Sequence, residues 1–222
     1  MRTRSRRRKM RMPPRQSTAS QQDILVAASR LFADHGFDGV SLSAIARLAG
    51  TSKANILYHF SSKDTLYIRV LEDSCIEVMD ALEMELNATS DIQQRLARFA
   101  ERHLQGLLER ADIGRLIMRE LQDRDNPRGR ELANGVLRNH FNAIVGHIES
   151  AQAQGTIRAN IDPAVLIATI LGADSFFFGN REHLRDNEKC QGFVDEPGRF
   201  TCGMVDILLN GILVPEPTPD PK

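Results

Sequence analysis

The chain has 222 residues with 29 basic and 29 acidic side chains, and 41% of its residues are hydrophobic. This composition excludes a wholly disordered chain and allows one large domain or two small ones with a buried core. The three cysteines are far apart without a C-x-x-C pair, which argues against a disulfide framework or a structural zinc site. The N-terminus lacks the apolar segment of a secretory signal, and the most apolar run, 164–173, is about half the length that spans a bilayer. We therefore expect a soluble cytoplasmic protein without a membrane partner.

The charges are distributed unevenly along the chain. Residues 1–15 hold eight basic side chains and no acidic one, whereas the remaining 207 residues hold 21 basic and 29 acidic side chains. A short basic arm on a mildly acidic body indicates a polyanionic partner for the arm. Since residues 1–19 are rich in Arg, Ser and Pro, we expect them to be disordered when free.

Helical periodicity recurs along almost the whole chain, and the alternating patterns of strands do not occur, so the predicted fold class is all-α with about nine helices. The first five helices are expected at 20–36, 41–50, 51–60, 61–87 and 90–110. Their expected N-caps are, in the same order, Ser20 (with Asp23 in a capping box), Ser41, Thr51 or Ser52, Ser61 (with Asp64), and Ser90.

The second half of the chain predicts four further helices. They are expected at 113–121, at 129–154 before Gly155, from Asp162-Pro163 to residue 178, and at 198–213. The polar residues 179–197 are expected to form a loop. Residues 215–222 contain four prolines, so this tail cannot be helical.

Residues 41–63, SLSAIARLAGTSKANILYHFSSK, have the pattern of a helix-turn-helix. Gly50 supplies the left-handed conformation that the turn needs, and Ala46 is small enough for the two helices to cross closely. Ile56 and Phe60 are spaced to point inward on the second helix. Its outward residues carry hydrogen-bonding groups and one cation, which suit base edges and phosphates. They are Thr51, Ser52, Lys53, Asn55, Tyr58 and His59.

The run SKANILYHFSSKDTL at 52–66 resembles the signature of the TetR family of one-component repressors, and the spacing of small and apolar residues from Ala28 to Gly50 matches the same family. The resemblance covers residues 21–70. It implies that Tyr58, His59 and Lys63 hold phosphates while Lys53, Ala54 and Asn55 lie deepest in the major groove. The complete set of implied DNA-binding residues is Ser41, Ser43, Thr51, Ser52, Lys53, Ala54, Asn55, Tyr58, His59 and Lys63.

The family resemblance also implies a homodimer on a palindromic operator and a C-terminal region that binds a small-molecule effector. Leu57 departs from the family, which often has a tyrosine there, so one phosphate contact is in question. Residues 55–71 and 155–163 loosely resemble the RutR-type subgroup. The expected organisation is a basic arm at 1–19, a helix-turn-helix domain at 20–66, a ligand-binding and dimerisation domain at 67–214, and a Pro-rich tail at 215–222.

The last two expected helices predict the dimer interface. The helix after Pro163 is apolar on nearly every side and must be buried all round. Together with the final helix it predicts a four-helix interface between two subunits, and a purely intramolecular core is the alternative.

The expected effector pocket lies between the fourth and the eighth helix. Its candidate lining residues are Met79, His103, Leu107, Arg119, Phe141 and Phe177. Arg119 and Glu120 could meet a polar or anionic effector, pair with each other, or lie in solvent. The histidines His103, His140 and His147 are typical of core or surface positions, so neither a metal site nor a cofactor is predicted. Cys75 is interpreted as a core residue, with an oxidation switch as the alternative.

The predicted function is therefore a TetR-type regulator, a repressor whose DNA binding responds to a small molecule. An architectural DNA-binding protein without an effector is the alternative, and a fully packed C-terminal core would favour it. The basic arm either enters the adjacent minor groove or is a solvated leader. Since the chain has no nucleophile elbow, phosphate loop or paired acid and base, we do not expect an enzyme.

Overall fold

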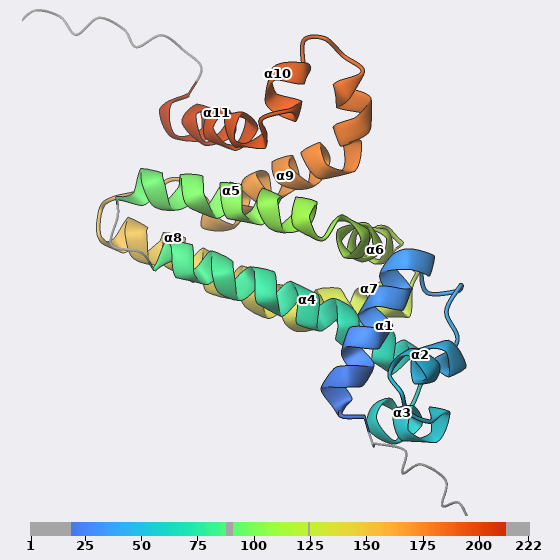
Figure 1. The fold of residues 1–222 in the computed structure, drawn as a ribbon. Coiled ribbons are helices and arrows are strands. Elements are labelled where there is room, and N and C mark those ends of the chain that lie inside the picture. The colour runs from blue at the N-terminus through green and yellow to red at the C-terminus, as the bar shows by residue number, and fades with distance from the viewer. Residues whose placement is uncertain (1–18, 88–90, 124, 212–222) are drawn as a thin grey trace, which may run out of the picture. The chain divides into compact units, whose positions relative to one another are not determined.

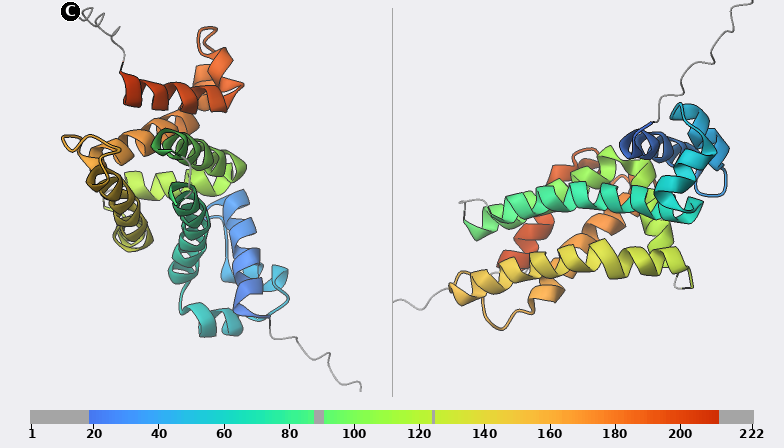
Figure 2. Two further views of the ribbon diagram at one scale, coloured as in Figure 1. Left: turned by 90° about the vertical axis from the view of Figure 1, so that its left-hand side faces the viewer. Right: turned by 90° about the horizontal axis from the view of Figure 1, so that it is seen from below.

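The computed structural model describes residues 19–87, 91–123 and 125–211, and within them it contains helices and no strand (Figures 1 and 2). The predicted all-α fold is confirmed. The chain divides into two compact units, residues 1–67 and residues 68–222. Helix α4 (Lys63–Leu86) begins in the first unit and continues into the second.

The first unit packs its helices around a small core. Its other helices are α1 (Gln21–His35), α2 (Leu42–Leu48) and α3 (Lys53–Phe60). Each helix places apolar side chains inward, and Ile24, Ile45 and Ile56 are fully buried. Phe32 and Tyr67 meet edge to face with ring centroids 4.9 Å apart, a favourable aromatic geometry that fixes the start of α4 on α1.

The N-caps decide where these helices begin. The predicted capping box of Ser20 with Asp23 is present, and Ser41 and Ser52 cap α2 and α3 as predicted. The prediction for α4 was wrong by one residue. Ser62 Oγ, rather than that of Ser61, accepts a hydrogen bond from the Thr65 amide at 3.0 Å.

Ser61 instead forms the turn between α3 and α4. Its φ is 56°, so it lies in the left-handed region and cannot provide the extended backbone of an N-cap. The cap of α5 also differs from the prediction. Asp91 accepts hydrogen bonds from the amides of Gln93 and Gln94, whereas Ser90 lies outside the described residues.

The second unit is built around α5 and α9, which pack against each other and against α11 (Figure 1). Besides the rest of α4, its helices are α5 (Ile92–Glu109), α6 (Ala111–Gln122), α7 (Pro127–Leu132), a π-helical turn η1 (Ala133–Leu137), α8 (Arg138–Ala153), α9 (Pro163–Arg185), α10 (Gln191–Val194) and α11 (Pro197–Asn210). The main core cluster joins Leu82, Leu96, Phe99, Ile144, Ile148, Ile167, Ile170 and Val205. A smaller cluster joins Leu104, Phe177 and Val194.

Two stretches of the second unit differ from the prediction. The helix expected at 129–154 is interrupted at Gly135, whose φ of −92° and ψ of −111° are not helical. The loop expected at 179–197 was wrong, because α9 continues to Arg185 and α10 follows. The polar residues after Phe178 mark an exposed face rather than the end of a helix, and Leu184 still packs against the smaller cluster.

Among the described helices, α9 is long and apolar enough to cross a membrane by length and composition alone. This apolar segment is longer than the run at 164–173 on which the expectation from the sequence was based. The helix packs against α5, α8, α10 and α11, and it carries the fully buried carboxyl group of Asp174. The described residues bury only 28% of its apolar stretch, so the burial all round that the sequence predicts is not reached within one chain.

The turn between α6 and α7 gives a test of the packing. A Cβ at the buried Gly129 would overlap the backbone carbonyl of Glu120, whereas a Cβ at Gly146 in α8 would meet no atom within 4 Å. We expect Gly129→Ala to lower the free energy of unfolding by about 1–3 kcal/mol, the usual effect of overpacking.

Gly146→Ala is the matched control, and it should raise stability by roughly 0.5–1 kcal/mol because alanine favours a helix interior. Urea unfolding followed by circular dichroism measures both variants. Equal stabilities of the two variants would contradict the close contact at Gly129.

Candidate functional site

The turn before α3 has the geometry that the helix-turn-helix pattern predicts. Gly50 has a φ of 66°, in the left-handed region, and the Thr51 amide donates to the Ala46 carbonyl at 2.9 Å. Ser52 Oγ accepts from the Asn55 amide at 3.1 Å and so caps the helix. The left-handed glycine closes the turn, and the side-chain cap satisfies one of the first helical N–H groups.

Helix α3 has one buried and one exposed face. Ile56 and Phe60 are buried and hold the helix against α1 and α2. Lys53, Ala54, Leu57, Tyr58 and His59 form the exposed face. Tyr58 is 84% exposed, which is unusual for an aromatic ring, and its ring meets that of His59 edge to face. The exposed face therefore offers a phenol, an imidazole and an ammonium group to a partner.

Asn55 lies differently from its exposed neighbours. Its side-chain amide donates to Thr51 Oγ1 at 3.0 Å and to the Ala19 carbonyl at 3.2 Å, and the residue is half-buried. It thus fastens Ala19, two residues before α1, to the beginning of α3. The sequence pattern placed Asn55 outward and gave no sign of this contact, because the partner lies 36 positions away in the chain.

The remaining candidate DNA-binding residues lie at helix starts of the same unit. Ser41 caps α2, and Ser43 is exposed in its first turn. Lys63 is the first residue of α4, and its Nζ lies 4.1 Å from the centre of the Phe37 ring. This cation–π contact orients the Lys63 side chain, while the ammonium group keeps its charge.

The second unit contains a cavity of about 190 Å³. Its wall is mostly aliphatic and contains no carboxylate and no aromatic ring other than an imidazole. The lining residues are Ser74, Cys75, Val78, Met79, His103, Gly106, Leu107, Arg110, Ile113, Gly114, Ile117, Met118, Leu121, Leu137, Leu171 and Ser175. Arg110 is partly exposed and forms an ion pair with Glu77 at 2.6 Å, so the described wall carries no unpaired cation.

His103 is the imidazole in this wall, and it is paired with a carboxyl group behind it. His103 Nδ1 lies 2.9 Å from Asp174 Oδ2, and the Asp174 side chain is completely buried. Burial raises the pKa of the Asp174 carboxyl, and the hydrogen bond with His103 opposes this shift. Sequence reasoning missed Asp174. The signal was an acidic residue inside an otherwise apolar helix, which must find a partner when it is buried.

The six candidate pocket residues divide into two groups. Met79, His103 and Leu107 line the cavity. Phe141 packs against the main core cluster, and Phe177 is fully buried with its ring centroid 4.8 Å from that of Phe200. The sixth residue, Arg119, lies outside the cavity wall.

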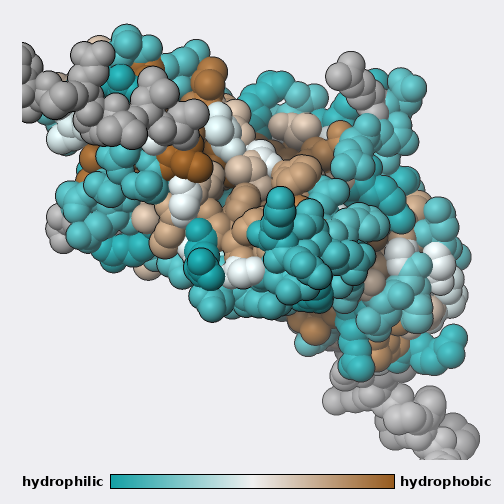
Figure 3. Space-filling model, turned by 90° about the horizontal axis from the view of Figure 1, so that it is seen from above, coloured by the Kyte–Doolittle hydropathy of each residue, from teal (hydrophilic) through white to brown (hydrophobic). Residues whose placement is uncertain are grey.

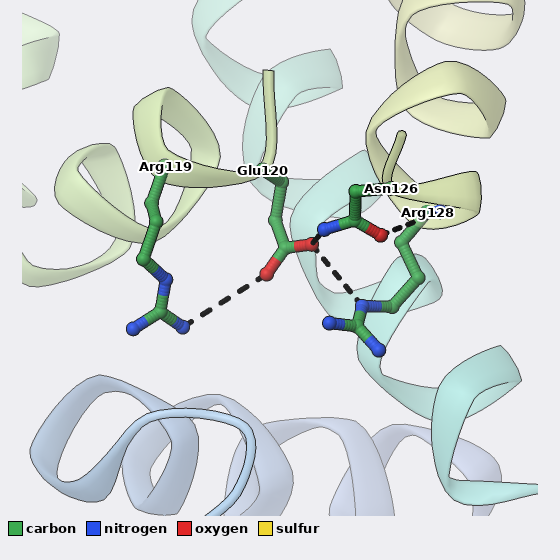
Figure 4. Close-up of polar contacts among 4 residues, drawn as sticks. All are labelled: Arg119, Glu120, Asn126 and Arg128. Carbon is green, nitrogen blue, oxygen red and sulfur yellow. Dashed lines mark hydrogen bonds and ion pairs between the residues drawn. The ribbon is translucent and has the colours of Figure 1, made fainter. Parts of the chain in front are cut away.

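Arg119 and Glu120 belong to a polar cluster at the turn from α6 to α7 (Figure 4). The Glu120 carboxylate is 2% exposed and accepts hydrogen bonds from the Asn126 side chain and, at 3.1 Å, from Arg128 Nε. Arg119 approaches the other oxygen at 3.9 Å. The Arg119 side chain is 60% exposed, so this residue lies mainly in solvent, while the hydrogen bonds of Glu120 with Asn126 and Arg128 hold this turn in place.

The described residues contain no group of three or more His, Cys, Asp or Glu side chains arranged to hold a metal ion. An apolar cavity in one unit and an exposed helix-turn-helix in the other are the features of a DNA-binding regulator rather than of a catalyst.

Comparison with known families identifies the class. Residues 24–70 match the bacterial regulatory proteins of the tetR family, and residues 90–218 match the tetracyclin repressor-like C-terminal domain. The chain belongs to the TetR family, whose members are DNA-binding transcriptional regulators and not enzymes.

The first curated relatives match this chain over only part of their own length. The transcriptional activator FasR of Mycolicibacterium smegmatis is 37% identical over 78 residues, which are 35% of this chain and 36% of FasR. The transcriptional regulator RutR of Escherichia coli K12 is 52% identical over 54 residues, which are 24% of this chain and 26% of RutR. The likeness to RutR is thus confirmed, over a quarter of that protein's length.

Solved structures extend the likeness to both units. The crystal structure of the regulator FadR from Bacillus subtilis in complex with stearoyl-CoA has a TM-score of 0.68 and 18% identity. The alignment covers 87% of this chain and 100% of that one. At this identity the similarity concerns the fold.

Cys75 in the cavity wall gives a prediction about reactivity. Burial, aided by the charge of Glu72, raises the pKa of the Cys75 thiol from 9.0 to about 12. At a given pH well below both values the thiolate is then about a thousandfold rarer, because each pKa unit is a factor of ten. We expect native Cys75 to be alkylated by iodoacetamide at pH 8 at least about a hundredfold more slowly than in urea.

Peptide mass spectrometry over time measures the alkylation of each cysteine. Cys190 and Cys202, which are half-buried and exposed, serve as internal references. If native Cys75 were alkylated as fast as in urea, the interpretation of Cys75 as an inert core residue would be contradicted. The alternative interpretation, an oxidation switch, would then stand.

Proposed function

We propose that the protein is a cytoplasmic repressor that binds a palindromic operator as a homodimer and responds to a small apolar effector. The observation that carries this proposal is the combination of an exposed polar face on α3 with an apolar cavity in the other unit. A purely architectural DNA-binding protein has no need for such a cavity, so the cavity favours the effector-responsive function.

The exposed face of α3 supports major-groove binding. Lys53 and Ala54 stand at its N-terminal end, where recognition helices contact base edges. Tyr58, His59 and Lys63 then serve as phosphate contacts around the groove, and Ser41 and Ser43 as backbone contacts at the start of α2. Asn55 and Thr51 share a hydrogen bond, so we propose that they shape the start of the helix in addition to facing DNA.

The contact of Asn55 with Ala19 supports a role for the basic arm. Ala19 is fastened beside the N-terminal end of α3, and we propose that the eight basic residues at 1–15 act at the same DNA surface. Between residues 21 and 67 the basic and acidic side chains balance, with four of each outside histidine. The arm is therefore the main source of positive charge for DNA binding.

Exposed apolar side chains on α9 and α11 support the dimer. Val165 and Phe176 on α9 are 60% and 59% exposed, and Ile207 on α11 is 54% exposed. A Cβ at Gly172 or Gly203 on these helices would meet no atom within 4 Å, so a second helix can approach closely there. Figure 3 looks onto the side where α11 lies and shows apolar side chains gathered between hydrophilic margins. We propose that a second copy covers this face.

The cavity supports an apolar effector of limited size. Its volume of about 190 Å³ exceeds that of an engineered apolar cavity of about 150 Å³ that binds benzene. A short aliphatic chain or a single ring fits this volume. A chain as long as the stearoyl group of the ligand in the B. subtilis FadR structure would extend beyond this volume. A cationic effector is disfavoured because the wall has neither a carboxylate nor a phenyl, phenol or indole ring.

Specific DNA binding is the first prediction of this function. Fluorescence anisotropy on the DNA that flanks the gene, with excess non-specific competitor, should show tight binding by one dimer per palindrome. Lys53→Gln should lower the preference for operator over competitor by about tenfold, because a base contact contributes about 1–3 kcal/mol to discrimination. Lys189→Gln, which removes an exposed cation from the second unit, is the control and should leave the preference unchanged.

The same assay across a salt series tests the arm. Deleting residues 2–15 should reduce the steepness of log K against log salt, and each phosphate neutralised accounts for a slope of about −0.9. An unchanged slope would show that the arm is a solvated leader. Weak binding of the full chain that competitor abolishes would instead favour the architectural alternative.

Dimerisation gives a second prediction. Phe176→Glu and Ile207→Glu should each raise the dimer dissociation constant by at least about tenfold, because burying an unpaired carboxylate is costly. Met84→Glu is the control, since Met84 is 74% exposed on α4 and lies on neither of the proposed interface helices. Sedimentation equilibrium measures all three. A dimer that tolerates both interface changes would place the interface elsewhere.

A further inference from the structure

The pair of His103 and Asp174 gives the cavity a polar point in an otherwise apolar wall. His103 is 7% exposed and lines the cavity, and Asp174 lies behind it at 0% exposed. The hydroxyl of Ser74, also in the wall, already donates to the Val70 carbonyl at 3.0 Å. Among the wall groups, which also include the Ser175 hydroxyl, His103 is the one that is paired with a buried carboxyl group.

The second nitrogen of His103 is open to the cavity. Nδ1 is used by Asp174, and within the described residues no group is hydrogen-bonded to Nε2. The fully buried side-chain atoms that lack a partner there are Arg95 Nε, Asp174 Oδ1 and Arg181 Nε. Nε2 is not one of them, so this atom keeps access to free volume, and the free volume beside His103 is the cavity.

Charge neutrality decides which role Nε2 has. A net charge is costly in an apolar interior, so the pair is most stable when it holds two dissociable protons and is neutral overall. These protons give either an imidazolium beside a carboxylate or a neutral imidazole beside a carboxylic acid. A proton on Asp174 Oδ1 would be a buried donor without an acceptor, because Oδ1 has no hydrogen-bond partner among the described residues. One proton therefore lies between Oδ2 and Nδ1, and Nε2 carries the other and donates into the cavity.

We propose that the effector is a neutral aliphatic carbonyl compound whose oxygen accepts a hydrogen bond from His103 Nε2, with Asp174 as the positioning residue. This inference rests on the proposed function of the cavity and narrows its ligand. The neutral pair offers no net charge to a carboxylate, and Arg110 is already paired with Glu77. A ketone, ester or thioester thus fits the wall better than a free fatty acid.

The protonation of the pair is tested without any ligand. Nitrogen NMR of ¹⁵N-histidine-labelled full-length protein at pH 7.5 should show a proton on Nε2 of His103, assigned by its loss in His103→Gln. Asp174→Asn should shift the His103 nitrogen signals, which a merely structural role of Asp174 would not predict. An unprotonated Nε2 in the wild type would overturn the proposal.

The ligand class is tested with two compounds of nearly the same shape. In 2-octanone a carbonyl stands where 2-methyl-1-octene has a methylidene group. Binding is followed by the methyl NMR signals of Met79 and Met118, which line the cavity. The double variant His103→Leu with Asp174→Leu replaces the buried pair by apolar residues, a change that proteins often tolerate.

The ratio of the affinities for the two compounds is compared between the two proteins, so that the difference in hydration between the compounds cancels. The preference for the ketone should fall by about tenfold from wild type to the double variant, because a buried carbonyl then lacks its donor. Ile117→Leu, elsewhere in the wall, is the matched control and should keep the wild-type preference. An unchanged preference while both compounds bind would overturn the role of His103 and leave the effector cavity standing. Binding of neither compound to the wild type would overturn the cavity as an effector site as well.

Discussion

The second unit is organised by the burial of α9. A helix of 23 residues that is apolar around most of its circumference must be covered on several sides. Helices α5, α8, α10 and α11 cover it in part, and they form the two core clusters in doing so. What remains exposed, including Val165 and Phe176, is the face that we assign to a second copy of the chain. The core and the proposed dimer interface are thus two consequences of one hydrophobic constraint.

The same burial explains the polar pair beside the cavity. Asp174 lies on the covered side of α9, where an unpaired carboxylate is too costly to persist. His103 on α5 pairs with the Asp174 carboxyl group, and its second nitrogen is then left on the side of the cavity. The cost of burying the Asp174 carboxylate on α9 therefore determines the hydrogen-bonding character of the cavity, through its pairing with His103. The cluster of Glu120, Asn126 and Arg128 solves a similar problem at the turn from α6 to α7, without an adjoining cavity (Figure 4).

The sequence predicted best what local interactions determine. The turn at Gly50, the caps at Ser20, Ser41 and Ser52, and the two faces of α3 depend on neighbours within a few residues, so pattern and spacing were sufficient. The cavity could not be predicted in the same way, because its wall combines residues of five elements. Phe177 was a reasonable candidate by its helix face, yet packing among aromatic rings buried it in the core. Asn55 likewise occupies a position that the helical pattern placed outward, while its contact with Ala19 depends on the tertiary fold.

Helix α4 gives the proposed response to an effector a physical route. Its first residues belong to the DNA-binding unit, and Ser74, Cys75, Val78 and Met79 farther along the same helix form part of the cavity wall. A ligand in the cavity therefore touches an element that is covalently continuous with the helix-turn-helix. It can shift the balance between DNA-binding and non-binding states only by the difference in its affinity for them. Such a difference arises when a movement of α4 changes how Ser74, Cys75, Val78 and Met79 pack around the ligand, because a densely packed wall responds to small displacements.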